Sequence, residues 1–458
     1  EDALGDGEEL AREEFAAVLW DQNEHSPAIQ LLSQVVDGIG VTQSSSASQK
    51  RRAARLLALL AQWRATARSQ QPREIDRSLF EPALKLTAVA ESPTASAEQS
   101  EIAYRWARFA EQHHRDSDLA EITRLRLYTD RRREEIAQNQ RECERTTSKT
   151  ERSKLLQFQR QAEKILLQDE TRLMELEASR THFLRRSVAM YARALATSDE
   201  HDDAVPRLVS LWLEHAADAE LNRLLSTCLP SIPSHKFVGL MHQLSARLTE
   251  LPDSADVMVP FQTNLSRLLL RMCQEHPFHC LYAIFALIKT GADAKAAATH
   301  RPSPRNTLSV PEGGASQSAS PPVLRSTAAE KIWTHIKRRS SLGKRIRTFE
   351  ELCLAYVEWA EFDLTSRADR YFQNSGSIKK GALRMPPSGE LRLARMRDLD
   401  IPVATARLEI DATCRYESFV SIVRYGETFT TAGGIHLPKI SECIGSDGRR
   451  YKQLFKRD

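Results

Sequence analysis

Glycine and cysteine are scarce in this sequence: its 458 residues include only 17 glycines and 7 cysteines. The cysteines are scattered and odd in number, which argues against the dense disulfide framework of a small secreted protein and favours a reducing compartment. A long hydrophobic run is also lacking. The longest, at 278–288, is well short of the roughly 20 residues that a membrane helix needs, and no signal-peptide pattern is present. We therefore expect a soluble protein with no membrane partner.

An excess of charge of either sign is missing too. Lys+Arg number 65 and Asp+Glu 61, and the net charge of +4 is too small to indicate a nucleic-acid surface by itself. With 41% hydrophobic residues, the chain can bury two or more cores. It opens with Glu-Asp-Ala rather than with Met, so we expect it to be an excerpt of a longer protein.

Helical periodicity dominates residues 8–295, where apolar residues recur three and four positions apart. The stretch "EELAREEFAAVLWDQNEHSPAIQLLSQVVD" predicts a helical hairpin with a turn at Ser26-Pro27. Trp20, Trp63 and Trp106 are spaced 43 residues apart, which lies within the ~40–47-residue period of two-helix solenoid repeats. Two equal intervals also arise by chance, so stacked helical pairs are predicted and the repeat register is left open.

A charged segment, 119–195, predicts two long helices that meet near 146–148 and form an antiparallel pair. Its basic run Arg131-Arg132-Arg133 is more typical of a solvated helix face than of a nucleic-acid site. Residues 300–327 are rich in proline, glycine and serine and predict a flexible linker. Helical periodicity returns at 328.

A second loose stretch follows at 373–390, and from residue 401 the hydrophobic period changes to two. The segments "TARLEI", "SFVSIVRY" and "ETFTTAG" then predict strands. The fold class is therefore mainly α with a C-terminal β module: an α-solenoid of helical hairpins followed by an antiparallel β-sheet. The predicted domains are a helical-repeat domain at 1–295, a flexible linker at 296–330, helices and a loop at 331–400, and the β module at 401–458.

Four potential metal ligands crowd together in "RMCQEHPFHCLYAIFALI": Cys273, His276, His279 and Cys280. Structural zinc sites usually pair such ligands across a longer loop. The alternative is a helix that ends at His276 and a buried helix that begins after Pro277, and we favour it. A metal site completed by residues outside the chain is left open.

The last stretch, "TTAGGIHLPKISECIGSDGRRYKQLFKRD", has the features of a phosphate site. Glycines let a backbone approach phosphate oxygens closely, and Gly433-Gly434 follow a predicted strand. A tight turn at 445–448 leads into the strand "RRYKQLFK", where alternation puts Leu454 and Lys456 on one face and Phe455 on the other. An apolar residue beside a lysine suits a nucleotide, but the same pattern occurs in inert hairpins.

The segment "AGGIHLPKISECIGSDGRRYKQLFK" resembles the N-lobe of the phosphatidylinositol 3-kinase-related protein kinases. It is most similar to their ATM branch, which includes a fungal telomere-length counterpart. Three further stretches resemble the FAT domain of ATM-type kinases: "SDEHDDAVPRLVSLWLEH" (198–215), "SHKFVGLMHQLSARL" (234–248) and "HPFHCLYAIFALIKTGAD" (276–293). The resemblance implies that 1–295 is a FAT domain and 401–458 a partial kinase N-lobe.

This resemblance also implies a nucleotide site. The family's glycine-rich loop falls on Thr431, Ala432, Gly433, Gly434, Ile435, His436 and Leu437. Pro438 and Leu454 would line the adenine pocket, and Lys456 falls on the family's nucleotide lysine, which contacts the phosphates of ATP. The family usually continues with glycine after that lysine, whereas Arg457 and Asp458 follow here, so Asp458 is left out of the site. The catalytic aspartate and the Mg²⁺ ligands would belong to the C-lobe.

The resemblance implies a serine/threonine kinase that uses ATP and Mg²⁺ to phosphorylate Ser/Thr-Gln sites of protein substrates. It further implies roles in DNA double-strand-break signalling, telomere maintenance and the cell-cycle checkpoint, in the nucleus and at telomeres. A break-sensing nuclease complex would recruit the kinase to DNA, and the kinase would be a homodimer. The alternative is a non-catalytic scaffold with a vestigial kinase lobe, which the retained Lys456 and glycines disfavour. A lipid kinase is disfavoured by the long FAT-like array.

Overall fold

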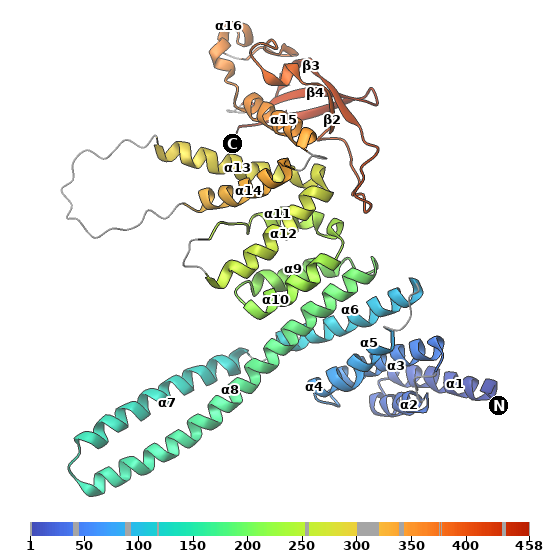
Figure 1. The fold of residues 1–458 in the computed structure, drawn as a ribbon, viewed down its shortest axis with the longest axis vertical. Coiled ribbons are helices and arrows are strands. Elements are labelled where there is room, and N and C mark those ends of the chain that lie inside the picture. The colour runs from blue at the N-terminus through green and yellow to red at the C-terminus, as the bar shows by residue number, and fades with distance from the viewer. Residues whose placement is uncertain are drawn as a thin grey trace. The chain divides into compact units, whose positions relative to one another are not determined.

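The structure is a computed structural model, shown in Figure 1, and it forms two compact units, Glu1–Ile232 and Pro233–Asp458. We call them the N-terminal unit and the C-terminal unit. The predicted domain boundaries at 295, 330 and 400 are not tested by this division. The residues that the structure describes are 2–39, 45–87, 93–116, 119–251, 256–299, 320–338, 343–374, 376, 378–432 and 437–457.

The N-terminal unit is built from helices, as its sequence period predicts. They are α1 (Asp2–Asp21), α2 (His25–Gly38), α3 (Ala47–Thr66), α4 (Pro72–Ile75), the π-helical turn η1 (Asp76–Phe80), α5 (Glu81–Thr87), α6 (Pro93–Asp116), α7 (Leu119–Arg145), α8 (Lys149–Thr197), α9 (Ala204–Glu214), α10 (Ala219–Cys228) and η2 (Leu229–Ser231). Most consecutive helices pack against each other, and α6 packs along α8, which confirms the predicted helical array.

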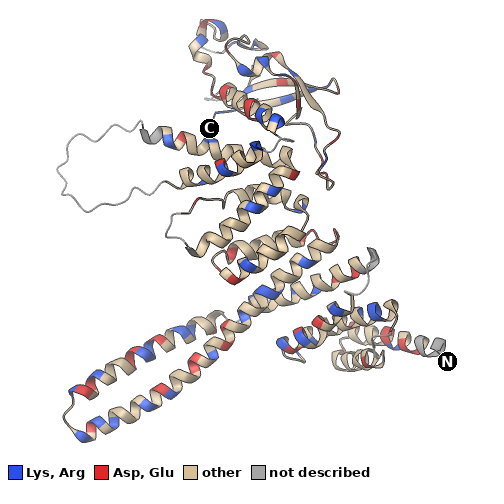
Figure 2. Ribbon diagram, in the orientation of Figure 1, with Lys and Arg blue, Asp and Glu red and all other residues tan. Residues whose placement is uncertain are grey.

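Helices α7 and α8 form the predicted antiparallel pair, and the turn between them lies at 146–148. Figure 2 shows that residues of both charge signs alternate along the pair. Within the basic run, Arg132 pairs with Asp169 at 2.8 Å and Arg133 with Glu170 at 2.7 Å. The run is therefore neutralised by the partner helix, as expected of a solvated face.

The three evenly spaced tryptophans do not share one environment. Trp20 and Trp63 stack on each other, with ring centroids 4.7 Å apart and planes 2° apart. Trp106 stacks instead on Phe80, at 5.7 Å. The equal spacing thus brings two of the three rings together, and the repeat register stays a prediction.

A buried carboxylate joins three helical elements of the N-terminal unit. Asp76, which is fully buried, accepts hydrogen bonds from Trp106 Nε1 (2.5 Å), His182 Nε2 (3.0 Å) and Arg186 Nη2 (3.2 Å). Burial by itself would raise the pKa of Asp76, but the hydrogen bond from His182 and the charge of Arg186 hold it below its ordinary value. The carboxylate therefore stays charged and links η1 to α6 and α8.

The C-terminal unit begins with helices and ends with a sheet. Its helical elements are η3 (Ser234–Leu240), α11 (Met241–Ser245), η4 (Asp256–Met258), α12 (Val259–Glu275), α13 (Pro277–Thr299), α14 (Pro321–Lys337), α15 (Gly343–Glu361), η5 (Leu364–Arg367), α16 (Ala368–Tyr371) and η6 (Arg392–Arg395). The predicted linker was too long, because α14 has Ser320 as its N-cap and already includes 321–330. Prolines at the first positions of a helix lack only N–H groups that would have no helical partner. Residues 300–319 of the predicted linker lie outside the described residues.

Five antiparallel strands make the sheet, with β3 paired to β1, β2 and β4, and β4 paired to β5. The strands are β1 (Leu383–Arg384), β2 (Arg397–Pro402), β3 (Ser421–Thr431), β4 (Lys439–Gly445) and β5 (Arg450–Phe455). This sheet after a helical array confirms the predicted fold class. The tight turn predicted at 445–448 joins β4 to β5, and Gly448 has a φ of +76° that favours glycine.

The strand predictions were partly wrong. The segments "SFVSIVRY" and "ETFTTAG" contribute to one strand, β3, which continues through Gly426. The segment "TARLEI", 405–410, is not a strand but part of a loop that Val403 and Val420 close by a backbone hydrogen bond of 2.9 Å. None of these six residues pairs with a strand, and Ile410 is 44% exposed. Period two alone therefore did not suffice to form a strand.

Helix α15 packs against one face of the sheet. Trp359 donates a hydrogen bond from Nε1 to Ser441 Oγ on β4 (3.0 Å), and its ring lies edge-on to Phe429 at 4.9 Å. Lys439, the first residue of β4, is buried on this face. It donates from Nζ to the carbonyl oxygen of Ala360 (3.0 Å) and lies 5.2 Å from the centroid of the Trp359 ring. Burial lowers the pKa of Lys439 to about 8, and the carboxylate of Asp363 offsets part of this.

We predict that Asp76→Asn destabilises the N-terminal unit by about 2 kcal/mol or more. The amide N–H groups of asparagine would face the N–H groups that donate to the carboxylate of Asp76, and some of these donors would lose their acceptor. The free energy of unfolding is measured by urea titration. Asp130→Asn is the matched control: Asp130 is exposed and pairs with Arg133, and its substitution should change stability by less than about 0.5 kcal/mol. Equal effects of the two substitutions would contradict the role given to Asp76.

For Lys439 we predict a pH-dependent contribution to stability. Its folded-state pKa of about 8 is lower than the ordinary value of 10.5. Between these pH values the unfolded chain binds more protons, so this lysine's contribution to the free energy of unfolding rises with pH.

The native chain should therefore gain stability relative to Lys439→Met as the pH rises above 8. The difference between their free energies of unfolding should change by at most about 1.4 kcal/mol per pH unit. Lys452→Met, at an exposed lysine of β5, controls for the loss of a lysine elsewhere in the sheet. A difference that stays constant with pH would contradict the prediction.

Candidate functional site

The predicted lysine and the predicted adenine contact lie on the outer face of the C-terminal edge strand. Leu454 is 61% exposed and Lys456 is exposed, whereas Phe455 between them is buried. This is the alternation that the sequence predicted. Side chains on opposite faces of a strand meet different surroundings, and here Phe455 packs against Tyr356 of α15, with ring centroids 5.4 Å apart. The face with Leu454 and Lys456 is thus the one turned away from α15.

The described part of the predicted glycine loop connects β3 to β4. The N–H of Ala432 donates to the carbonyl oxygen of Pro438 at 2.8 Å, which closes the base of the loop. Leu437 has a φ of +43°, a strained value for a residue with a Cβ. Gly433, Gly434, Ile435 and His436 lie outside the described residues, so their predicted approach to phosphates stays a prediction.

Strand pairing brings the two predicted segments together. In the β4–β5 register Ile440 is opposite Leu454 and Lys439 is opposite Phe455. Pro438 directly precedes Lys439, and Lys456 directly follows Phe455. The base of the loop and the predicted lysine therefore meet at the same end of the sheet, which also holds Thr431 opposite Lys439 on β3.

This arrangement can hold a nucleotide but supplies only part of the chemistry of phosphoryl transfer. An exposed leucine offers an apolar surface for a base, and a lysine ammonium offers a fixed positive charge for phosphate oxygens. None of the predicted site residues is a carboxylate, and Asp458 lies outside the described residues. The described part of the site therefore offers Mg²⁺ no acidic ligand of its own.

Lys439 is a feature of this region that sequence reasoning missed. It directly follows the loop, and its ammonium reaches the carbonyl oxygen of Ala360, near the C-terminal end of α15. A cation at a helix C-terminus is favoured by the helix dipole. Through this bond the end of the glycine loop is tied to the helix behind the sheet. Side-chain alternation along β4 places Lys439 on the buried face of the strand. This alternation was the one feature of the sequence that could have indicated a buried lysine.

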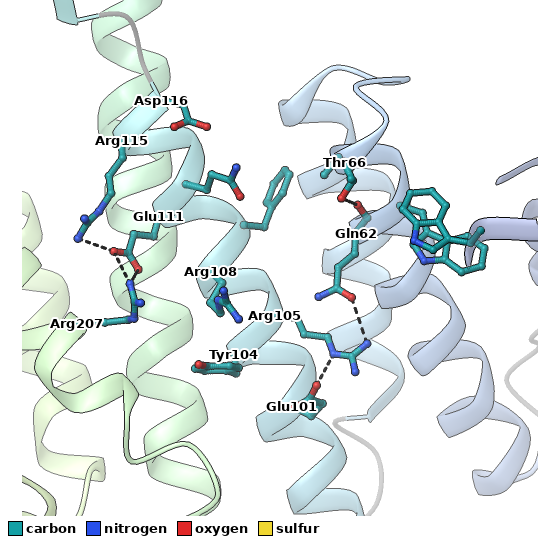
Figure 3. A pocket seen from close by; sticks show the side chains of 15 residues that line it. Gln62, Thr66, Glu101, Tyr104, Arg105, Arg108, Glu111, Arg115, Asp116 and Arg207 are labelled. Atoms are coloured by element: carbon teal, nitrogen blue, oxygen red, sulfur yellow. Dashed lines mark hydrogen bonds and ion pairs between the residues drawn. The ribbon is translucent and has the colours of Figure 1, made fainter. Parts of the chain in front are cut away.

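A separate cavity of about 730 Å³ lies in the N-terminal unit and is shown in Figure 3. Four arginines line it together with three carboxylates, and three of the arginines are paired. Arg115 and Arg207 both pair with Glu111, at 2.7 and 3.3 Å. Arg105 pairs with Glu101 and also donates to Gln62. This cavity therefore has no strong positive field for an anionic ligand.

The four potential metal ligands that crowd together in the sequence do not form one group among the described residues. Cys273 and Cys280 interact with each other, and this hydrogen bond together with burial raises the pKa of Cys273 well above its ordinary value. Among the described residues, the one group of three possible ligands within 4.8 Å of one another is Glu275, His276 and Cys414. The predicted helix end at His276 is confirmed: this residue is the C-cap of α12.

No helix in the described ranges combines the length and the hydrophobicity needed to cross a membrane. A comparison with protein-family profiles finds no match.

Curated proteins give clear matches over nearly the whole chain. The serine/threonine-protein kinase TEL1 of Cryptococcus neoformans var. neoformans serotype D (strain B-3501A) is 30% identical over 449 residues, which cover 98% of this chain and 13% of that protein. The tel1 kinase of Emericella nidulans is 28% identical over 98% of this chain and 15% of its own length. The serine-protein kinase ATM of Sus scrofa is 31% identical over 63% of this chain and 9% of that protein. The chain thus spans about one seventh of the length of the fungal relatives.

Solved structures agree with these matches. The FAT and kinase domain of CtTel1 aligns with a TM-score of 0.72 and 26% identity, covering 97% of this chain and 27% of that one. The complete CtTel1 dimer with C2 symmetry aligns with a TM-score of 0.73 and 25% identity, covering 98% of this chain and 14% of that one. Both the helices and the sheet take part in these alignments, since almost the whole chain is covered. We therefore identify the chain as a homologue of the Tel1 and ATM serine/threonine-protein kinases, in the region where their FAT helices lead into the kinase N-lobe.

Proposed function

We propose that the chain is the FAT-to-N-lobe segment of an ATP-dependent protein kinase that phosphorylates Ser-Gln and Thr-Gln sites of protein substrates. One observation carries the proposal: a segment homologous to Tel1 and ATM ends in a sheet whose outer face presents Leu454 and Lys456 beside the base of the predicted glycine loop. A vestigial lobe has no need of an exposed lysine and leucine at these two positions. This disfavours the non-catalytic scaffold, which is the second candidate.

In the proposed site, each residue has a separate task. The glycine loop at 431–437 would cover the phosphates, Pro438 and Leu454 would hold the adenine, and Lys456 would bind phosphate oxygens through its ammonium group. ATP supplies the phosphoryl group, and Mg²⁺ bound by the C-lobe of the parent protein would neutralise charge on the phosphates. Positioning and electrostatic stabilisation are the main contributions a protein makes to phosphoryl transfer.

The names of the relatives support finer proposals. Because the chain is homologous to Tel1 and ATM, we place the parent protein in DNA double-strand-break signalling, telomere maintenance and the cell-cycle checkpoint. It would act in the nucleus, including at telomeres, and reach DNA indirectly through a break-sensing nuclease complex. The CtTel1 structure is a C2-symmetric dimer, which supports a homodimer here as well.

The first prediction from this proposal concerns Lys456. In the full-length parent protein, Lys456→Ala should lower phosphoryl transfer to a Ser-Gln peptide by roughly 100-fold or more, because one charge-stabilising donor is lost. Phosphate incorporation is measured with Mg-ATP, alongside a Ser-Ala peptide that should not be phosphorylated. Lys452→Ala is the matched control, since Lys452 is an exposed lysine four residues earlier on the same face of β5. Full activity of the Lys456 variant would overturn the assignment, and an inactive parent protein would favour the scaffold.

The second prediction concerns Leu454. Leu454→Gln in the parent protein should raise KM for ATP about 10-fold and leave kcat nearly unchanged, because an apolar contact to the base stabilises ground state and transition state alike. Because the side chain is exposed, the substitution should leave the melting temperature of the protein unaltered. A fall in kcat at constant KM would contradict an adenine contact.

A further inference from the structure

A buried histidine in the C-terminal unit collects polar groups from three parts of the chain. His276 is fully buried between α12 and α13. Around it lie Ser234 at the start of η3, Glu275 at the end of α12, and Cys414 and Tyr416 from the loop before β3. We call these five residues the His276 cluster. They are separate from the proposed nucleotide site, and the inference below does not rest on the proposed function.

The loop that supplies Cys414 and Tyr416 is held in an uncommon conformation. Both residues have positive φ, +60° and +49°, although neither is glycine. The Asp411 carboxylate accepts hydrogen bonds from the backbone N–H groups of Thr413 (2.8 Å), Arg415 (3.1 Å) and Tyr416 (3.0 Å). Each strained residue costs on the order of 1 kcal/mol, which the surrounding contacts must offset. The result is that a thiol and a phenol point at one imidazole.

Three polar side chains lie near one nitrogen of that imidazole, Nε2. Ser234 Oγ lies 2.9 Å from His276 Nε2, and Cys414 Sγ lies 3.7 Å from the same atom. The carboxylate of Glu275 is within 4.8 Å of both the thiol and the imidazole, and it also accepts a hydrogen bond from Ser234. A ring nitrogen has one proton or one lone pair and can make one good hydrogen bond. Ser234 makes that bond, so the thiol of Cys414 has only long contacts, at 3.7 Å to His276 Nε2 and at 3.7 Å to the carbonyl oxygen of Ala412.

We propose that Glu275, His276 and Cys414 bind a zinc ion. In tetrahedral zinc sites the Zn–S and Zn–N bonds of about 2.3 and 2.05 Å place sulfur and nitrogen about 3.6 Å apart. The observed separation of 3.7 Å between Cys414 Sγ and His276 Nε2 fits this geometry. Thiolate, imidazole and carboxylate are also the ligand types that zinc accepts, and a thiolate disfavours Mg²⁺ and Ca²⁺. Ser234 Oγ or a water would take the fourth position.

The other nitrogen of the imidazole is already oriented for this role. Nδ1 of His276 lies 2.6 Å from the hydroxyl of Tyr416. In metal sites the second nitrogen of a ligating histidine usually donates its N–H to such a partner, which fixes the tautomer and the ring orientation. With Nδ1–H directed at Tyr416, the lone pair of Nε2 is directed at the space between Ser234, Glu275 and Cys414.

The thiolate should contribute more to zinc affinity than Glu275 does, because zinc is a borderline-soft ion that favours sulfur ligands. A bound zinc would join the α12–α13 junction to the loop that leads into β3, two segments that are 138 residues apart in sequence.

The test is zinc binding by the full chain, purified under reducing conditions. We expect about one zinc per chain by elemental analysis, and the absorption of a cobalt–thiolate bond after exchange with Co²⁺. Cys414→Ser should lower zinc affinity by about 100-fold or more and abolish that absorption. Cys228→Ser, which removes a partly exposed cysteine of α10, is the matched control and should change neither. Circular dichroism establishes that each variant keeps its helices.

Glu275→Gln provides a second measurement that leaves the thiol in place. It should weaken zinc binding about 10-fold while the cobalt–thiolate absorption persists. A folded native chain that binds no zinc would overturn the proposal and leave the His276 cluster as a hydrogen-bond network. So would zinc bound equally well by the native chain and by Cys414→Ser, because the metal would then be held by other residues.

Discussion

The packing of α15 on the sheet is the constraint on which the C-terminal unit depends. A sheet edge that presents the proposed nucleotide site on one face must bury its other face, and α15 covers that face through Tyr356 and Trp359. Two polar side chains under the helix find partners there: Trp359 donates to Ser441, and Lys439 donates to the carbonyl oxygen of Ala360. Burying an ammonium group is costly unless it finds a hydrogen-bond acceptor and an aromatic face, and Lys439 has both. The position of the loop next to Lys439 is thereby coupled to the helix behind it.

The N-terminal unit also buries a charged side chain, in this case a carboxylate instead of an ammonium group. Its helices bury apolar stripes, yet Asp76 sits among them without access to water. The carboxylate is stable there because an indole, an imidazole and a guanidinium from two other helices donate to it. Both units thus use one buried charge to fix how their elements meet. Such a charge tolerates few alternative packings, since any shift leaves it without a partner.

Much of the fold was predictable because it depends on local periodicity. The helical array, the α7–α8 pair with its turn at 146–148, and the β4–β5 hairpin all follow from apolar spacing and turn residues. The alternation of Leu454, Phe455 and Lys456 was likewise readable, because side chains of a strand alternate whatever surrounds it. The prediction failed at 405–410, where a period of two met no partner strand. It also failed at 321–330, where prolines that suggested a linker instead begin a helix.

The sequence by itself determined the elements and the family resemblance, because both depend on residues close together in the chain. The tertiary structure decided which distant residues meet. The sequence did not indicate that His276 lies next to Cys414, which is 138 residues later in the chain. From the sequence, its neighbours Cys273 and Cys280 were the candidate partners. The geometry of the helices and the strained loop at 414–416 bring His276 and Cys414 together. In the same way, the sequence marked Lys456 as the lysine of interest, but only packing showed that Lys439 is buried against α15. Sequence spacing fixes the face on which a side chain lies, and tertiary packing fixes what that face meets.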